Sequence, residues 1–282
     1  MRRKIYDTVF YFMTALCMLL ALVILYQIFG FLLRRGIPIM YRQLVGLQET
    51  EILMPGRLFP LIVSTVFLTG VTLLLVLPFS VSAAIYLNEY ARENPLALMT
   101  RFCVQTLASI PSIVYGLFGM LIFVRLSKFG LSILAGAGTL AVMLLPIMMT
   151  QTENALRQIP HSYREASASL GATSFETIKT IILPQVAPGV LVGVLLSIGR
   201  ILSESAALVF TLGTFVRMPT NSQTGLLSIF EAGTTLTIRA LVEFKEYGNV
   251  EAAAAIGVMT VGVMISLNLV SKLINGVFRK QN

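Results

Sequence analysis

Charged residues are scarce in this sequence. Of its 282 residues only 12% are Asp, Glu, Lys or Arg, whereas 56% are hydrophobic. A soluble globular domain carries about 25% charged and about 45–50% apolar residues. This composition, together with a mean hydropathy of +0.84, excludes a water-soluble fold.

Cysteine and histidine are almost absent, since Cys17, Cys103 and His161 are the only ones. So few cysteines exclude a disulfide framework, and a single histidine without suitably spaced partners offers no metal site. Both cysteines stand in apolar runs, where we expect them to be buried as small hydrophobic residues. The sequence also lacks a G-x4-G-K-[ST] motif, which cradles nucleotide phosphates. We therefore expect neither ATP hydrolysis nor a cofactor or metal on this chain.

Long uncharged stretches dominate what is present. Each approaches or exceeds the roughly 20 residues that cross a bilayer core, and each must be helical because unpaired peptide groups in lipid are costly. We expect an all-α integral membrane protein with six transmembrane helices. The first is an uncleaved span, because its apolar core exceeds the roughly 7–15 residues of a signal peptide. The six stretches are Thr8–Leu33, Leu58–Asn88, Phe102–Val124, Phe129–Thr152, Thr180–Gly199 and Ala252–Ser271.

The distribution of Lys and Arg indicates the orientation of these helices. The formal net charge is +8, which in a soluble protein suggests nucleic acid; here the cations fall between apolar runs, so membrane topology explains them and we expect no nucleic-acid partner. The basic N-terminal triplet Arg2-Arg3-Lys4 and the basic tail favour cytoplasmic termini at both ends. Residues 34–57 and 210–251 then face outward, with an amphipathic helix over Thr234–Tyr247 that ends at Gly248.

One segment between the fourth and fifth spans carries strong local signals. Ser162 and Glu165 fit a capping box, which predicts a short helix over Tyr163–Leu170, and Gly171 can adopt the left-handed conformation that ends it. A second capping box, Thr173-Ser-Phe-Glu176, starts another helix, which Pro184 then disrupts or kinks. The alternative from these patterns alone is a plain connector with no partner.

The same residues resemble the EAA motif of ABC-importer permeases, E-A-A-x3-G-x9-I-x-L-P. Glu165, Ala166, Gly171 and Ile181-x-Leu183-Pro184 match, and Ser167 in place of Ala is the only departure. The resemblance implies the fold of a type I ABC importer permease and a coupling helix that docks in a groove of a separate ATP-hydrolysing subunit. Small residues at 166 and 167 would permit close contact there, and Gly171 would set the bend.

Two charges, Arg200 and Glu204, interrupt the fifth span. Charges inside a membrane usually face a cavity and have a function, and the i, i+4 spacing puts both on one face. Gly189, Gly193 and Ser197 share that face and form a small-x3-small stripe, which lets another helix approach closely. The pair indicates anion handling, because a guanidinium matches tetrahedral oxyanions and Glu204 can neutralise it when the path is empty. A structural ion pair or a snorkelling side chain is the alternative.

Gly199–Leu208 resembles the R-x-x-G-E-T-A-P-L signature of phosphate-importer permeases of the PstA type, with departures at Ser203, Ser205 and Ala207. Ile110–Gly119 is similar to another segment of that family, I-P-S-I-V-x-G-L. The family's R-T-T-E sequence after the fourth span is here Thr150-Gln-Thr-Glu153, so its Arg is missing.

This second resemblance implies a subunit of an ATP-driven phosphate importer that works by alternating access. Arg200, Glu204, Ser197 and Ser203 would line the substrate pathway. The implied partners are a second permease, two ATP-binding subunits, an extracytoplasmic phosphate-binding protein and membrane lipid. Importers of sulfate, molybdate or phosphonate are alternatives, and an ATP-independent channel or secondary transporter is another.

Residues 1–57 then form an N-terminal helix and outer loop, and residues 58–282 form a permease core of five transmembrane helices. That core includes the coupling loop 151–184 and the outer segment 210–251. Asn88-Glu89-Tyr90, at the inner end of the second span, fits a plain interfacial anchor better than a support for the loop, because Tyr favours that depth in general.

Overall fold

The computed structural model describes residues 2–44, 55–91, 94–221 and 224–280, and the regular structure in these ranges is helical apart from a single β-bridge between Thr220 and Leu227. The long helices are α1 (Arg2–Leu44), α2 (Pro55–Ile85), α5 (Ile133–Arg157), α8 (Leu183–Ser203) and α11 (Val250–Lys280). The shorter ones are α3 (Pro95–Ala108), α4 (Ser112–Gly119), α6 (Ser162–Ser169), α7 (Ser174–Thr177), α9 (Ala206–Val209) and α10 (Leu236–Lys245), with π-helical stretches η1 (Tyr86–Tyr90), η2 (Met120–Leu126) and η3 (Ile178–Ile182).

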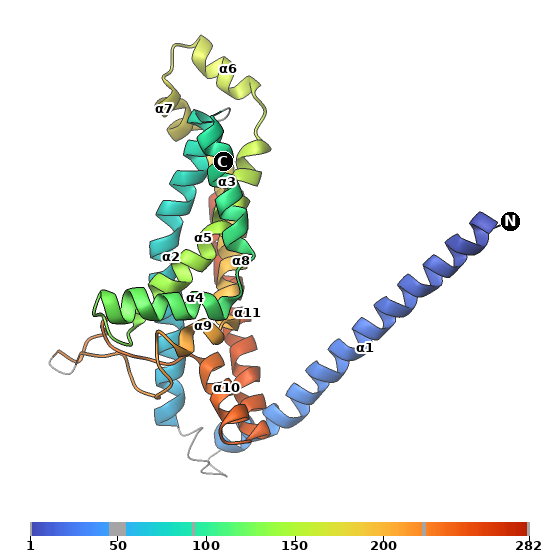
Figure 1. Ribbon diagram of the computed structural model, residues 1–282, viewed down its shortest axis with the longest axis vertical. Coiled ribbons are helices and arrows are strands. Elements are labelled where there is room, and N and C mark those ends of the chain that lie inside the picture. Colours follow the sequence, from blue (N-terminus) through green and yellow to red (C-terminus); the bar gives the residue numbers. More distant parts are fainter. Residues whose placement is uncertain (1, 45–54, 92–93, 222–223, 281–282) are drawn as a thin grey trace.

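Within the described residues, five helical segments are long and apolar enough to cross a membrane, each overlapping one of the predicted stretches. The protein is therefore a multi-pass membrane protein. α6 and α7 lie at one end of the helix bundle and α10 lies toward the other (Figure 1); we refer to these as the α6 end and the α10 end.

The remaining predicted span, Phe102–Val124, which is the third in chain order, is wrong as a continuous helix. α3 and the α4–η2 segment meet at a bend of 100°. Pro111 lies at the bend; a proline has no N–H to continue a helix, and it disfavours helical geometry in the residue before it. The hydroxyl of Tyr115 donates to the carbonyl of Leu107 at 2.7 Å across the bend. α3 and the α4–η2 segment add a sixth span only if the bent pair crosses the membrane as one unit.

The core is built around α2 and α5. A cluster of fully buried side chains joins these helices to α8, including Leu68, Leu140, Leu144 and Ile201. Hydroxyl groups are also buried on α2, where Thr65, Thr69 and Thr72 each donate to the carbonyl four residues earlier. This bonding satisfies the hydroxyl donors within α2, and the hydroxyl of Thr65 also accepts the N–H of Leu236 on α10 at 3.2 Å.

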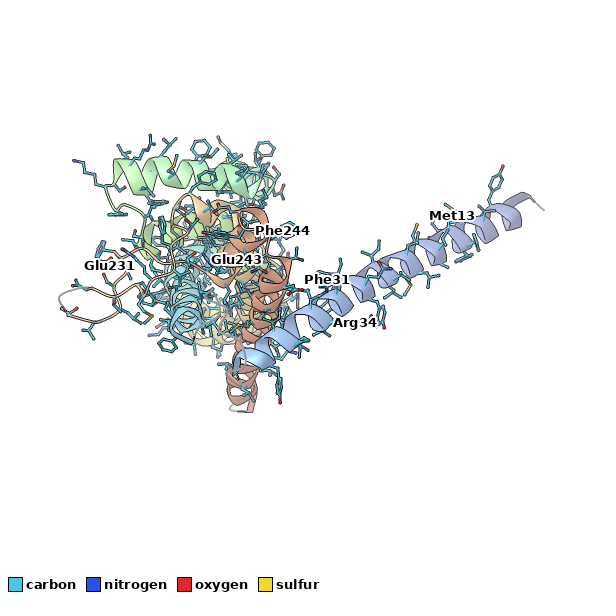
Figure 2. The ribbon with its side chains drawn as sticks, turned by 90° about the horizontal axis from the view of Figure 1, so that it is seen from below. Met13, Phe31, Arg34, Glu231, Glu243 and Phe244 are labelled. Atoms are coloured by element: carbon cyan, nitrogen blue, oxygen red, sulfur yellow. The ribbon has the colours of Figure 1, made fainter. Side chains whose placement is uncertain are left out.

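Helix α1 differs from all the others. Its contact with the bundle is against α11, where a Cβ on Gly36 would lie 2.7 Å from the carbonyl oxygen of Ala254. The rest of α1 projects away from the bundle (Figure 1), and side chains along it such as Met13 and Phe31 are exposed (Figure 2). Cys17 on α1 and Cys103 on α3 are exposed, so the prediction that both are buried is wrong, because neither helix buries the face that carries its cysteine.

The segment 210–235 covers the start of α5. The N–H groups of Ile133 and Leu134 donate to the carbonyls of Glu231 and Ile229 at 2.9 and 2.7 Å, and these are donors that a helix start leaves unsatisfied. The chain then enters α10, which lies within the predicted range Thr234–Tyr247, and Gly248 follows with φ +63° as expected for a helix-ending glycine. Burial raises the pKa of the Glu243 carboxyl on α10, and its ion pair with Arg239 opposes that shift.

Candidate coupling loop and translocation face

The segment between α5 and α8 folds as helix, glycine bend, helix. Gly171 has φ +81°, so the predicted left-handed bend is confirmed. The predicted capping box at Ser162 is wrong: α6 begins at Ser162 itself, and His161, which occupies the N-cap, makes no side-chain cap bond. The second capping box is confirmed, since Thr173 and Glu176 bond reciprocally. Hydrogen bonds from the Thr173 N–H and hydroxyl hold the pKa of Glu176 below its ordinary value.

The EAA residues of α6 face in different directions. Glu165 and Ala166 are exposed, whereas Ser167 is buried and its hydroxyl lies 2.8 Å from that of Thr177. Ser167 therefore ties α6 to the following helix rather than presenting itself outward. Two large apolar side chains that the sequence reading did not single out, Leu170 and Phe175, are 89% and 67% exposed here.

Arg164 joins the coupling loop to the end of α2. Its guanidinium donates to both carboxylate oxygens of Glu89 at 2.6 and 2.8 Å, and also to the carbonyl of Ile159 at 3.2 Å. The hydrogen bonds to Glu89 hold the pKa of Arg164 above its ordinary value, although burial opposes this shift. The interpretation of Asn88-Glu89-Tyr90 as a plain interfacial anchor is therefore wrong. No local pattern signals a pair whose members are 75 residues apart.

Pro184 lies in the first turn of α8, directly after the π-helical stretch η3. A proline supplies no N–H to the preceding turn, and the predicted disruption takes the form of this π-helical stretch. The helix nevertheless runs without a break from Ser174 to Ser203. The second helix of the loop is thus continuous with a membrane-spanning helix.

Gly189 and Gly193 of α8 face α5. A Cβ on Gly189 would overlap the Cβ of Ala155, and one on Gly193 would lie 3.2 Å from the sulfur of Met148. Ser197, one turn further, is fully buried, and its hydroxyl has no hydrogen-bond partner among the described residues. The stripe of Gly189, Gly193 and Ser197 therefore packs against α5 within this chain. Ser197 does not share an open face with Arg200.

Arg200 and Glu204 form an ion pair at 3.2 Å in which the two side chains are 44% and 4% exposed. Glu204 is no longer helical and caps the end of α8. Its carboxylate accepts the N–H of Ala207 at 3.2 Å, and its carbonyl accepts the hydroxyl of Thr237 at 3.2 Å. These contacts hold Glu204 in place. The guanidinium of Arg200, by contrast, is exposed on the outer face of α8. Ser203 is also exposed and bonds back to the carbonyl of Arg200.

An exposed stripe continues from Arg200 along α8 toward the α6 end, at helical spacing. It leads to a cavity of about 540 Å³ between α5 and α8, which we call the α5–α8 cavity. Amide side chains are frequent in its lining, among them Gln151 and Asn154 of α5 and Gln158 directly after that helix. The stripe consists of Gln185, Pro188, Val192, Leu196 and Arg200.

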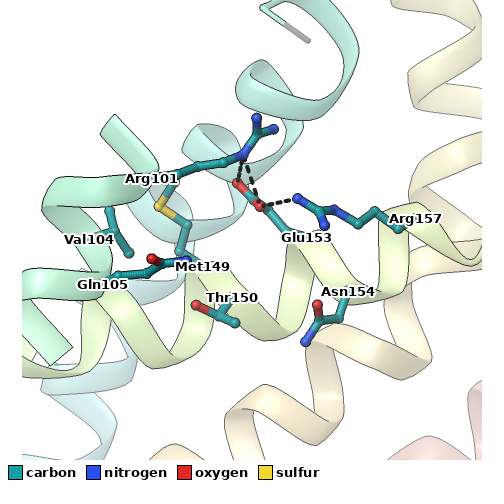
Figure 3. A pocket seen from close by; sticks show the side chains of 8 residues that line it. All are labelled: Arg101, Val104, Gln105, Met149, Thr150, Glu153, Asn154 and Arg157. Atoms are coloured by element: carbon teal, nitrogen blue, oxygen red, sulfur yellow. Dashed lines mark hydrogen bonds and ion pairs between the residues drawn. The ribbon is translucent and has the colours of Figure 1, made fainter. Parts of the chain in front are cut away.

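A second cavity, of about 130 Å³, lies between α3 and α5, and we call it the α3–α5 cavity. Arg101 and Arg157 both contact the carboxylate of Glu153 there, at 3.3 and 3.5 Å (Figure 3). Thr150, the position at which the R-T-T-E sequence has its Arg, also lines this cavity. Across the described part of the chain, no three His, Cys, Asp or Glu side chains come together as a metal site.

Comparison with known proteins identifies the family. Residues 77–281 match the family described as binding-protein-dependent transport system inner membrane component. The chain is 33% identical over 244 residues to the probable ABC transporter permease protein YqgI of Bacillus subtilis, covering 84% of this chain and 83% of that relative. It is 38% identical over 180 residues to the phosphate transport system permease protein PstA of Pasteurella multocida, covering 64% of each.

The fold is similarly matched. A chain of the bacterial alginate ABC transporter, solved in complex with an alginate pentasaccharide-bound periplasmic protein, superposes with a TM-score of 0.66 at 18% identity, over 92% of both chains. The expected type I importer permease fold is therefore confirmed. This chain belongs to the family of inner membrane components of binding-protein-dependent transport systems.

Proposed function

We propose that the chain is the permease subunit of an ATP-driven importer of inorganic phosphate and forms half of the translocation pathway. The observation that carries this proposal is the Arg200–Glu204 pair, in which the carboxylate is fixed and buried while the guanidinium is presented on the open face of α8. A guanidinium offers a planar fork of donors suited to a tetrahedral oxyanion. The PstA name of one relative points to the same anion.

Glu204 acts as the counter-ion of Arg200 while the pathway is empty. Because an arriving phosphate must compete with Glu204 for the guanidinium, it is held weakly enough to leave again. Ser203 supplies a neutral hydroxyl beside Arg200. The buried position of Ser197 gives it a packing role instead of the pathway role expected from the sequence.

Coupling to ATP hydrolysis takes place at α6 and α7. The exposed Glu165 and Ala166, with the apolar Leu170 and Phe175, form the surface that docks on an ATP-binding subunit. Since α7 continues into α8, a displacement of the docked loop moves the helix that carries Arg200. ATP binding and hydrolysis then bias the permease between two conformations because the docked partner favours one of them.

The partners are a second permease, two ATP-binding subunits, an extracytoplasmic phosphate-binding protein and membrane lipid, and the chain itself lies in the cell membrane. The α6 end faces the cytoplasm, as do both termini, in agreement with the basic residues at the chain ends. A division into residues 1–57 and a core over residues 58–282 is supported by the way α1 meets the bundle and by a family match that begins at residue 77.

Uptake of radiolabelled phosphate by the complete transporter in proteoliposomes tests this function. We expect uptake that requires ATP, the ATP-binding subunits and the phosphate-loaded binding protein. Excess sulfate, molybdate or phosphonate should compete poorly. Strong competition by one of these would assign the chain to that anion instead. Phosphate uptake without nucleotide or partner subunits would overturn the proposal in favour of a channel or secondary transporter.

A further inference from the structure

The α3–α5 cavity repeats the arrangement at the end of α8. Arg157 and Glu153 are spaced i, i+4, and their side chains are 58% and 10% exposed. Arg200 and Glu204 are likewise spaced i, i+4, and their exposures are 44% and 4%. In both pairs the carboxylate is buried against the bundle and the guanidinium is presented outward.

The carboxylate of the second pair is also fixed by a third group. Arg101 contacts Glu153 at 3.3 Å and donates to the carbonyl of Leu87 at 2.9 Å (Figure 3). Two guanidinium groups thus share one carboxylate, which leaves the cluster with a net charge of +1. Neutral donors from Gln105, Thr150 and Asn154 line the same cavity. Its volume of about 130 Å³ is that of roughly four water molecules in the liquid, enough for one small oxyanion.

The two pairs are connected along the molecule. The exposed stripe of α8 runs from Arg200 to Gln185, about 22 Å of helix, and ends in the α5–α8 cavity. Asn154 lines both that cavity and the α3–α5 cavity. The two cavities therefore meet at Asn154, and the exposed stripe of α8 connects Arg200 to the first of them.

We propose that the α3–α5 cavity is a second anion site, in which Arg157, with Arg101, receives the phosphate group after it leaves Arg200. This inference rests on the proposed function. Glu153 neutralises the cluster while the site is empty, as Glu204 does at Arg200. The net charge of +1 and the exposed donors attract the anion. Because the buried carboxylate of Glu153 competes for the same guanidinium groups, the anion is bound weakly. The headgroup phosphate of an anionic lipid has the same chemistry, and the experiment must separate these two sources.

The test uses the complete permease–ATPase complex without nucleotide or binding protein, in detergent, and measures radiolabelled inorganic phosphate by equilibrium dialysis. All variants carry Arg200→Gln, so that the part of the remaining binding that depends on Arg157 reports the α3–α5 cavity. In this background we expect saturable binding. Adding Arg157→Gln should weaken it at least tenfold, Arg157→Lys should weaken it less, and Lys272→Gln, an exposed cation on α11, should leave it unchanged.

The proposal is overturned if Arg200→Gln alone abolishes saturable binding, or if adding Arg157→Gln leaves the affinity unchanged. Native mass spectrometry of the same complexes with added phosphatidylglycerol forms the second arm. Lipid retention that depends on Arg157, without phosphate binding, would make a lipid headgroup the occupant and would also overturn the proposal. Uptake separates this inference from the proposed function: normal uptake by Arg200→Gln contradicts the latter, whatever the dialysis gives.

Discussion

The proposed translocation face at the end of α8 and the coupling loop each contain an Arg–Glu pair, and the two pairs differ in how far the arginine is exposed. At the end of α8 the carboxylate of Glu204 is buried and Arg200 is 44% exposed. In the coupling loop both partners are mostly covered, with Arg164 and Glu89 exposed by 19% and 11%, and the contact is bidentate. A half-open pair leaves donors for a ligand. A closed pair fixes two helices to each other.

The largest effect on transport is expected at Arg200. Arg200→Ala should reduce phosphate uptake by at least about tenfold, because hydrogen bonds to charged groups contribute about 1.5–3 kcal/mol. The complex should still assemble, since the side chain is exposed. Arg125→Ala, at an exposed arginine of η2, is the control and should transport normally. Wild-type uptake by Arg200→Ala in proteoliposomes would refute the pathway role.

Variants of the closed pair, Arg164–Glu89, should impair the coupling of transport to ATP hydrolysis rather than phosphate binding. Glu89→Gln or Arg164→Gln removes the bidentate ion pair between two mostly covered side chains, and breaking a buried pair costs at most about 3–5 kcal/mol. We expect phosphate moved per ATP hydrolysed to fall several-fold while ATP hydrolysis continues. The exchange Glu89→Arg with Arg164→Glu should restore part of the coupling. If either single variant retains full coupling, the link between α6 and α2 transmits nothing.

Glu204→Gln should strengthen phosphate binding, whereas Arg200→Ala should weaken it. A glutamine can still accept the N–H of Ala207, so the contact with the start of α9 survives, but Arg200 loses its counter-ion. Phosphate should then be held more tightly, which lowers both the half-saturating concentration and the maximal rate of uptake. Initial rates over a range of phosphate concentrations measure both quantities. A raised half-saturating concentration would contradict the counter-ion role.

Local rules in the sequence predicted much of this structure. Gly171, the capping box at Thr173 and five of the apolar spans depend on neighbouring residues, and all are found. The uncharged length of Phe102–Val124 does not reveal the break between α3 and α4, although Pro111 signals it. The pair Glu89–Arg164 and the cluster around Glu153 join distant segments, so tertiary packing decides them. Likewise, Ser197 and Arg200 differ because α5 covers only one side of α8.

The smallest effect is expected at the exposed cap of α7. Thr173→Ala removes an N-cap, which usually costs about 0.5–2 kcal/mol, but the closed pair and the Ser167–Thr177 contact still hold the loop. Uptake should therefore change little, while hydrogen exchange at α7 becomes faster. Since the folded-state pKa of Glu176 is lowered, its contribution is present above the ordinary pKa of 4.5 and is lost as the pH falls through the lowered value. Exchange at α7 should accordingly accelerate on acidification in the wild type and less so in Glu176→Gln. A loss of coupling in Thr173→Ala as large as that in Glu89→Gln would show that the exposed cap, and not the closed pair, holds the coupling loop in place.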